Sequence, residues 1–87
     1  MRPEELTALL RKRPFVPLRI HMTDGHIYDV PHPELLMVGR SNAVIGLRPD
    51  PQTGVVDRTD YFALLHIVRV EDLPPVASMG TTTNAPT

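Results

Sequence analysis

Five side chains of this chain are candidates for binding a polyanion such as RNA. Arg11, Lys12 and Arg13 are consecutive, and clustered cations release counterions when they meet phosphate groups. Arg19 follows in the next apolar segment, and His66 separates two apolar runs, where its ring could contact a base. Each has a structural alternative, because cations stabilise a helix C-terminus and a histidine in a tight kink often satisfies a backbone carbonyl.

Metal binding and catalysis have less support in the residue pattern. His21, His26 and His32 lie in or beside one predicted hairpin, but their spacing matches no recognised ligand pattern and the chain has no cysteine. Asp29, His32 and Glu34 could form an acid–base group, yet no nucleophile motif accompanies them and a short chain offers little protein to enclose them. We therefore predict a non-enzymatic protein with no catalytic residue, no metal site and no cofactor.

Charge is distributed unevenly along the chain. The formal net charge is −1, but residues 1–22 carry five cations and two acids, for a net charge of +3. The overall balance argues against a strongly basic nucleic-acid protein, whereas the N-terminal quarter is a local basic surface. The absence of cysteine, of a signal peptide and of an apolar run near about 18 residues predicts a cytoplasmic protein without a membrane partner.

The elements that must position these side chains begin with a short helix, predicted at about residues 3–13. Pro3 and the two acids after it suit the first turn of a helix, and the basic residues followed by a proline suit its end. Leu6, Leu9 and Leu10 form one apolar stripe. This stripe must pack on the segments that follow, because so short a helix is unstable alone.

Residues 18–30 predict a β-hairpin, because two alternating runs flank an Asp-Gly turn. A plain two-residue turn would pair Ile20 with Asp29 and bury that carboxylate. We therefore expect one extra residue in the loop, with Gly25 in the left-handed conformation. In that register the residues of the return strand that point inward are Tyr28 and Val30, and Asp29 points to solvent.

Four further segments complete the predicted strands. Residues 35–38 and 43–47 are apolar without alternation, which predicts that both faces of each strand are covered, one of them by the helix or a second subunit. Residues 48–57 contain two prolines and a glycine and predict an exposed loop or hairpin tip. The last two strands are predicted at 61–65 and 67–71, joined by a tight kink.

Together these elements predict one domain, residues 1–75, that is mainly β with one N-terminal helix and forms a small five-stranded antiparallel barrel. Residues 76–87 are small and polar and predict a disordered tail. Among the aromatic residues, Phe15, Tyr28 and Phe62 are expected in the core, whereas Tyr61 is the aromatic expected at the surface.

This order of elements resembles the Sm-like proteins, and among them the bacterial Hfq-like RNA chaperones. The matching segments are residues 6–13, residues 16–20 with the Asp-Gly turn, and residues 65–67. The resemblance implies a ring of subunits joined by edge-strand pairing. It also implies that single-stranded RNA contacts the histidine that matches His66 and the basic helix positions near Arg11, Lys12 and Arg13.

The chain departs from the Sm-like pattern at two places. Leu65 stands where the family has a lysine, and residues 31–34 replace an aspartate and an aromatic residue that the family has after its second strand. Residues 14–46 are similar in addition to a group of small bacterial proteins with no known activity.

Two functions remain open on this basis. The first is a non-enzymatic homo-oligomer of Sm-like barrels that binds RNA through Arg11, Lys12, Arg13, Arg19 and His66. The second is an SH3-like protein-interaction or scaffold module without RNA binding, in which apolar strand faces and the His-Pro-Glu loop contact a protein partner. The basic N-terminal quarter favours the first function, whereas the acidic remainder and Leu65 favour the second.

Overall fold

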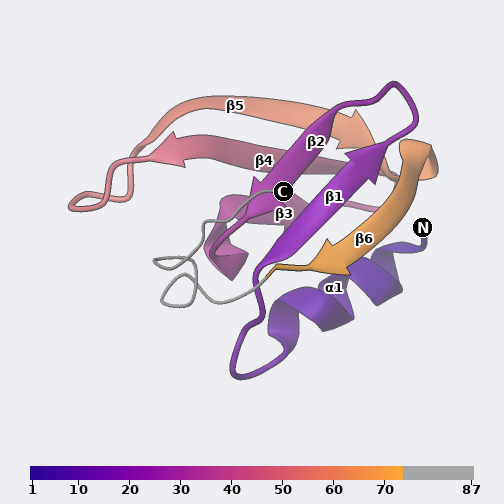
Figure 1. Cartoon of the computed structure of the whole chain (residues 1–87), viewed down its shortest axis with the longest axis horizontal. Coiled ribbons are helices and arrows are strands. Elements are labelled where there is room, and N and C mark those ends of the chain that lie inside the picture. Colours follow the sequence, from indigo (N-terminus) through magenta and orange to yellow (C-terminus); the bar gives the residue numbers. More distant parts are fainter. Residues whose placement is uncertain (74–87) are drawn as a thin grey trace.

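The computed structural model describes residues 1–73, and the predicted tail of residues 76–87 lies outside them. Helix α1 spans Pro3–Arg11. One sheet contains β1 (Leu18–Met22), β2 (Ile27–Val30) and β6 (Ile67–Asp72), and the other contains β3 (Leu36–Val38), β4 (Asn42–Pro49) and β5 (Val56–Ala63). Two 3-10 helices, η1 (Pro33–Leu35) and η2 (Leu64–His66), precede β3 and β6 (Figure 1).

The predicted five-stranded barrel is wrong, although the mainly β class with one N-terminal helix is confirmed. The described strands form two separate three-stranded antiparallel sheets, of order β2-β1-β6 and β3-β4-β5, and neither is closed. Pro31 and Pro33 separate β2 from β3, because proline lacks the N–H that a strand ladder needs. At the other crossing, η2 separates β5 from β6. Residues 1–73 therefore form six strands in two sheets instead of one continuous barrel wall.

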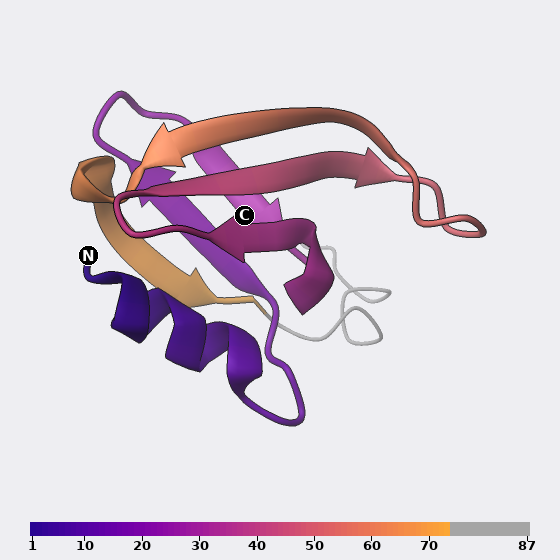
Figure 2. The same ribbon diagram turned by 180° about the vertical axis from the view of Figure 1, so that it is seen from behind.

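Helix α1 begins where it was predicted and ends two residues earlier, at Arg11. The Arg2 backbone N–H donates to the Glu5 carboxylate at 3.0 Å, which satisfies a donor at the helix start. Leu6 is fully buried, and the other two leucines of the stripe pack partly buried against the core. In both views the helix lies beside β6 (Figures 1 and 2).

The register predicted for the β1–β2 hairpin is confirmed. Ile20 pairs with Tyr28, and Gly25 has a φ of 91°. The Met22 backbone N–H donates to the His26 carbonyl at 2.9 Å, which closes the longer loop. This register keeps Asp29 exposed, so no uncompensated carboxylate enters the core.

The core lies between the two sheets, which Figure 2 shows as two layers. Burial alternates along β1 and through Ala43–Ile45 of β4, as expected of strands with one face toward a core. The fully buried side chains of largest volume are Leu6, Leu18, Ile20, Ile45 and Val30.

The predicted coverage of both faces of residues 35–38 and 43–47 is not provided by residues 1–73 of one copy. Met37 of β3 is 73% exposed and Val44 of β4 is 42% exposed, although α1 contacts β3. One face of the β3-β4-β5 sheet is therefore open to solvent at these positions.

The segment predicted as an exposed loop or hairpin tip is a tip at residues 50–55, and the flanking strands extend further than expected. The Asp50 carboxylate accepts backbone N–H bonds from Gln52 and Thr53, which holds the turn. The β4–β5 hairpin projects beyond the rest of the described chain (Figure 1).

Candidate functional site

The five residues predicted to contact RNA lie on three separate elements. Arg11 ends α1, with Lys12 and Arg13 directly after it, whereas Arg19 lies on β1 and His66 in η2. The Met1 amino group lies 3.4 Å from the carbonyl of the first residue of η2, so η2 adjoins the N-terminal end of α1. His66 and the basic cluster therefore lie toward opposite ends of α1.

Two of these cations are engaged by other groups of the chain. The Arg13 guanidinium donates to the Leu10 and Lys12 carbonyls, both at 2.9 Å, and so caps the end of α1. The Arg19 guanidinium donates two hydrogen bonds to the Asp29 carboxylate, at 2.8 and 3.1 Å. This carboxylate raises the pKa of Arg19. Both cations are thus held by hydrogen bonds within the chain, and these hydrogen bonds compete with phosphate binding.

His66 is exposed. Within residues 1–73 its ring makes no hydrogen bond to a backbone carbonyl, contrary to the structural alternative. Its Nδ1 atom lies 3.4 Å from the Thr23 hydroxyl, and its own carbonyl accepts the Thr23 backbone N–H at 2.9 Å. The histidine therefore joins η2 to the β1–β2 turn.

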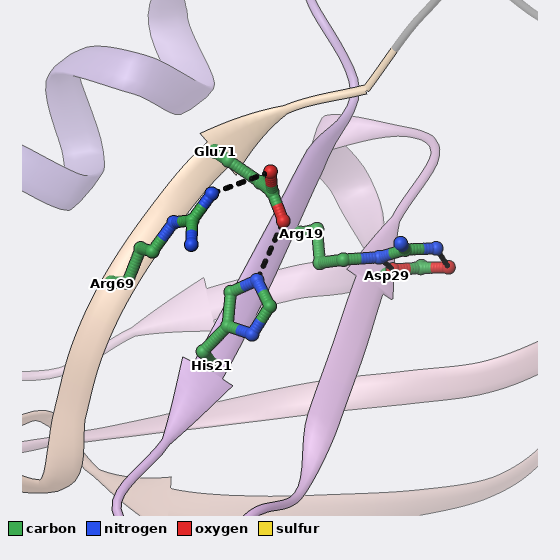
Figure 3. Close-up of polar contacts among 5 residues, drawn as sticks. All are labelled: Arg19, His21, Asp29, Arg69 and Glu71. Atoms are coloured by element: carbon green, nitrogen blue, oxygen red, sulfur yellow. Dashed lines mark hydrogen bonds and ion pairs between the residues drawn. The ribbon is translucent and has the colours of Figure 1, made fainter. Parts of the chain in front are cut away.

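The outer face of the β2-β1-β6 sheet carries charges that pair with one another (Figure 3). Besides the Arg19–Asp29 pair, the Glu71 carboxylate lies 2.6 Å from His21 Nε2 and 3.0 Å from an Arg69 nitrogen. The hydrogen bond from His21, followed by the charge of Arg69, lowers the pKa of Glu71. This face therefore presents neutralised pairs instead of free charge.

The outer face of the β3-β4-β5 sheet carries a row of exposed apolar side chains, which we call the apolar strip. It consists of Met37, Val44 and Tyr61, of which Met37 is 73% and Tyr61 74% exposed. Val44 pairs directly with Met37 on one side and with Tyr61 on the other. Directly opposed residues on antiparallel strands have Cβ atoms about 5 Å apart, so the three side chains form one continuous surface.

A hollow of about 500 Å³, which we call the aromatic hollow, adjoins the Tyr61 end of the strip. The rings of His26, Tyr28 and Phe62 stack along it, with centroids 6.2 and 5.1 Å apart. Asp24 and Asp60 also line it. Among its described lining residues there is no lysine or arginine, so the hollow suits a cationic group.

The aromatic hollow lies where the edge strands β2 and β5 of the two sheets approach each other. The Tyr28 hydroxyl donates to the Asp60 carboxylate at 2.7 Å and bridges these strands. Burial, followed by this hydrogen bond, raises the pKa of Tyr28 to about 12. A side-chain contact thus connects the sheets at a place where, within residues 1–73, no backbone ladder does.

A second hollow, of about 440 Å³, adjoins the Met37 end of the strip, between α1 and β3. Arg11 and Arg13 line it together with the apolar side chains of Leu10 and Met37, and Glu34 is its acidic residue. We call it the basic hollow. The apolar strip therefore runs from a hollow with two arginines to a hollow with two aspartates.

The histidines considered as metal ligands lie apart. His21 pairs with Glu71, whereas His26 Nδ1 lies 3.0 Å from the Asp24 carboxylate. Within residues 1–73, no group of three or more His, Cys, Asp or Glu side chains is arranged to hold a metal ion. Over the same range, no helix has the length and apolarity needed to span a membrane.

Apolar strand faces were predicted as a contact surface of the second candidate function, but Met37, Val44 and Tyr61 were not identified as its members. The lack of alternation in residues 35–38 and 43–47 indicated apolar side chains on both faces. The surface position expected for Tyr61 is confirmed. The pairing of Met37, Val44 and Tyr61 in one row depends on strand register, which these local patterns do not contain.

Comparison with known proteins finds no family model, no curated protein and no solved structure that matches this chain. The geometry of the described residues is therefore the basis for a functional proposal.

Proposed function

We propose that this protein is a non-enzymatic interaction module that self-associates through the apolar strip. The observation that supports this function is the unbroken row of Met37, Val44 and Tyr61, which no element within residues 1–73 covers. Burial of apolar surface stabilises association by about 25 cal/mol per Å². Methionine and tyrosine are also enriched in protein interfaces.

A second copy of the chain is the partner that best fits this surface. The described core contains eleven buried hydrophobic residues, and small domains with limited cores often gain stability by oligomerisation. The formal net charge of −1 adds little repulsion between copies. A second copy of the chain can therefore supply the partner surface.

RNA binding is a second candidate function, and one observation favours it. Arg11 and Lys12 make no ion pair within residues 1–73, whereas Arg19 is held by Asp29. These two exposed cations could contact phosphates beside the basic hollow. The engagement of Arg13 and Arg19, and the distance of His66 from the helix end, make RNA the weaker candidate.

The first test compares solution mass by light scattering over a range of protein concentrations. We expect the native chain to form a dimer or larger assembly and Tyr61→Glu to shift it to monomer, because a carboxylate cannot be buried in an apolar interface without a partner. Ile27→Glu is the matched control, since Ile27 is 54% exposed on the other sheet and should leave the mass unchanged. A monomeric native chain, or full association of Tyr61→Glu, would contradict the proposal.

The same samples separate the two candidates when a short U-rich RNA is added at low and moderate salt. RNA binding at low salt that weakens as salt rises, and that Arg11→Glu with Lys12→Glu removes, would support the second candidate. Association that depends on Tyr61 and is indifferent to RNA would support the first.

A further inference from the structure

We propose that two copies meet strip on strip in an antiparallel arrangement, with the basic hollow of each copy against the aromatic hollow of the other. This inference rests on the proposed self-association and adds the orientation of the two copies. It is carried by the opposite charges of the two hollows at the ends of the apolar strip.

Two copies that use the same face must be related by a two-fold axis lying in the plane of the interface. If that axis runs along the strip, Met37 meets its own equivalent and each basic hollow lies on the other basic hollow. If the axis passes near Val44 across the strip, Met37 meets the partner's Tyr61. The second orientation exchanges the two ends of the strip, because it superposes β3 of one copy on β5 of the other.

Charge decides between these orientations. Two arginines and one acid, Glu34, line the hollow beside Met37, whereas Asp24 and Asp60 line the hollow beside Tyr61 without any lysine or arginine. The crosswise axis brings arginines to carboxylates at both ends of the interface, whereas the lengthwise axis brings like charges together. Like-charge contacts across an interface are strongly unfavourable, so they exclude wrong registers.

The side chains of the two hollows suit each other in chemistry as well as in charge. A guanidinium binds a carboxylate by hydrogen bonds and also packs on an aromatic face. The aromatic hollow offers both, since Tyr28 and Phe62 stack beside the two aspartates. Asp24 is the accessible carboxylate, with a side chain 66% exposed, and Arg11 is the exposed arginine that does not cap the helix.

The test exchanges these charges. Arg11→Glu alone and Asp24→Lys alone each create two repulsive contacts per dimer. We expect each to raise the dimer dissociation constant by about tenfold or more in light scattering at low salt. An equimolar mixture of the two variants should recover association, because every contact in the mixed dimer is again between opposite charges. The chain that carries both changes should also associate.

Further variants separate a charge effect from a folding effect. The Asp24 carboxylate accepts the His26 backbone N–H at 2.9 Å, so Asp24→Asn removes the charge and keeps an acceptor in the turn. We expect it to weaken association less than Asp24→Lys and to unfold in urea like the native chain. Asp72→Lys, an exposed charge change on β6, is the control and should leave the mass unchanged.

The outcomes distinguish this inference from the function on which it rests. Recovery in the mixture supports the antiparallel arrangement. Native mass in both single variants, with loss of association in Tyr61→Glu, would overturn the arrangement and leave self-association standing. A native chain that is monomeric at every concentration would overturn both.

Discussion

The outer faces of the two sheets expose different kinds of side chain to solvent. On the β2-β1-β6 sheet the exposed side chains include paired charges beside the apolar Ile27 and Val68, and Glu71 accepts from both His21 and Arg69 (Figure 3). On the β3-β4-β5 sheet, Val44 lies between two neighbours that are more than 70% exposed and apolar. The charged groups of the first face are paired within one chain. The apolar side chains of the second face have no such pairing available, because apolar atoms gain stability only by leaving water.

This difference supports the proposed use of the β3-β4-β5 face. A charged face with internal pairs loses those pairs on binding, which costs about as much as new pairs contribute. An apolar face loses only contact with water. Interaction through the β3-β4-β5 sheet is therefore favoured although both sheets have three strands and an exposed face.

The largest expected effect comes from neighbouring positions of β4 that face opposite ways. Ile45 is fully buried and Val44 is 42% exposed. We expect Ile45→Ala to lower the free energy of unfolding by about 2–4 kcal/mol, because it leaves a cavity in the core. Val44→Ala should lower it by less than about 1 kcal/mol in dilute monomer and should weaken association. Urea unfolding and light scattering of both variants test this prediction. Equal losses of unfolding free energy in the two variants would contradict the distinction between a buried and an exposed face of β4.

The next effect concerns the turn that sets the register of the first sheet. Gly25 has a φ of 91°, and a Cβ added there would meet no atom within 4 Å. Gly25→Val should therefore destabilise the fold by about 1–3 kcal/mol through backbone strain alone. Urea unfolding measures it, and a change of a few tenths would show that the turn adopts another conformation.

The contact between the two sheets gives a pH-dependent prediction. The pKa of Tyr28 is raised to about 12 from an ordinary 10.0, so the stabilisation from the protonated hydroxyl is complete below pH 10 and is lost as pH rises through about 12. Tyr28→Phe should cost about 1–2 kcal/mol at pH 8. It should also reduce the loss of stability between pH 8 and pH 11 in urea unfolding. Tyr61→Phe is the matched control at an exposed tyrosine, and an equal effect of both variants would contradict the role of the Tyr28–Asp60 bond.

The smallest effect is expected on the charged face. The pKa of Glu71 is lowered, chiefly by the hydrogen bond from His21, so its contribution is present above an ordinary pKa of 4.5 and is lost as pH falls below it. Glu71→Gln should therefore flatten the acid side of the stability profile, with little change in association. Thermal unfolding between pH 3 and pH 7 tests this. A profile identical to that of the native chain would mean that the paired charges do not stabilise this face.

Several local features of the fold were predictable because they depend on neighbours in the chain. The start of α1 follows from a proline and two acids, and the hairpin register follows from the cost of burying Asp29. The tight connection between β5 and β6 is η2, at the position where the sequence predicted a kink. In each case the physical cause lies within about ten residues.

The closure of the sheet was not predictable in the same way. Whether β2 and β5 form a ladder depends on how closely two edges meet that lie about thirty residues apart in the chain. Here Tyr28 and Asp60 connect those edges by side chains, and the sheets stay separate. The sequence also could not predict that the candidate RNA residues lie on separate elements, because the partners of Arg13 and Arg19 are set by the folded backbone.

The sequence by itself determined the helix, the hairpin and its register, and the presence of more apolar strand surface than one small core can cover. Short-range sterics, side-chain periodicity and the cost of burying charge suffice for these. Only the tertiary structure decided that the surplus surface is one row of three side chains, with two arginines beside one end and two aspartates beside the other. That arrangement depends on contacts among α1, the turn after β1 and all three strands of the second sheet, which no local pattern specifies.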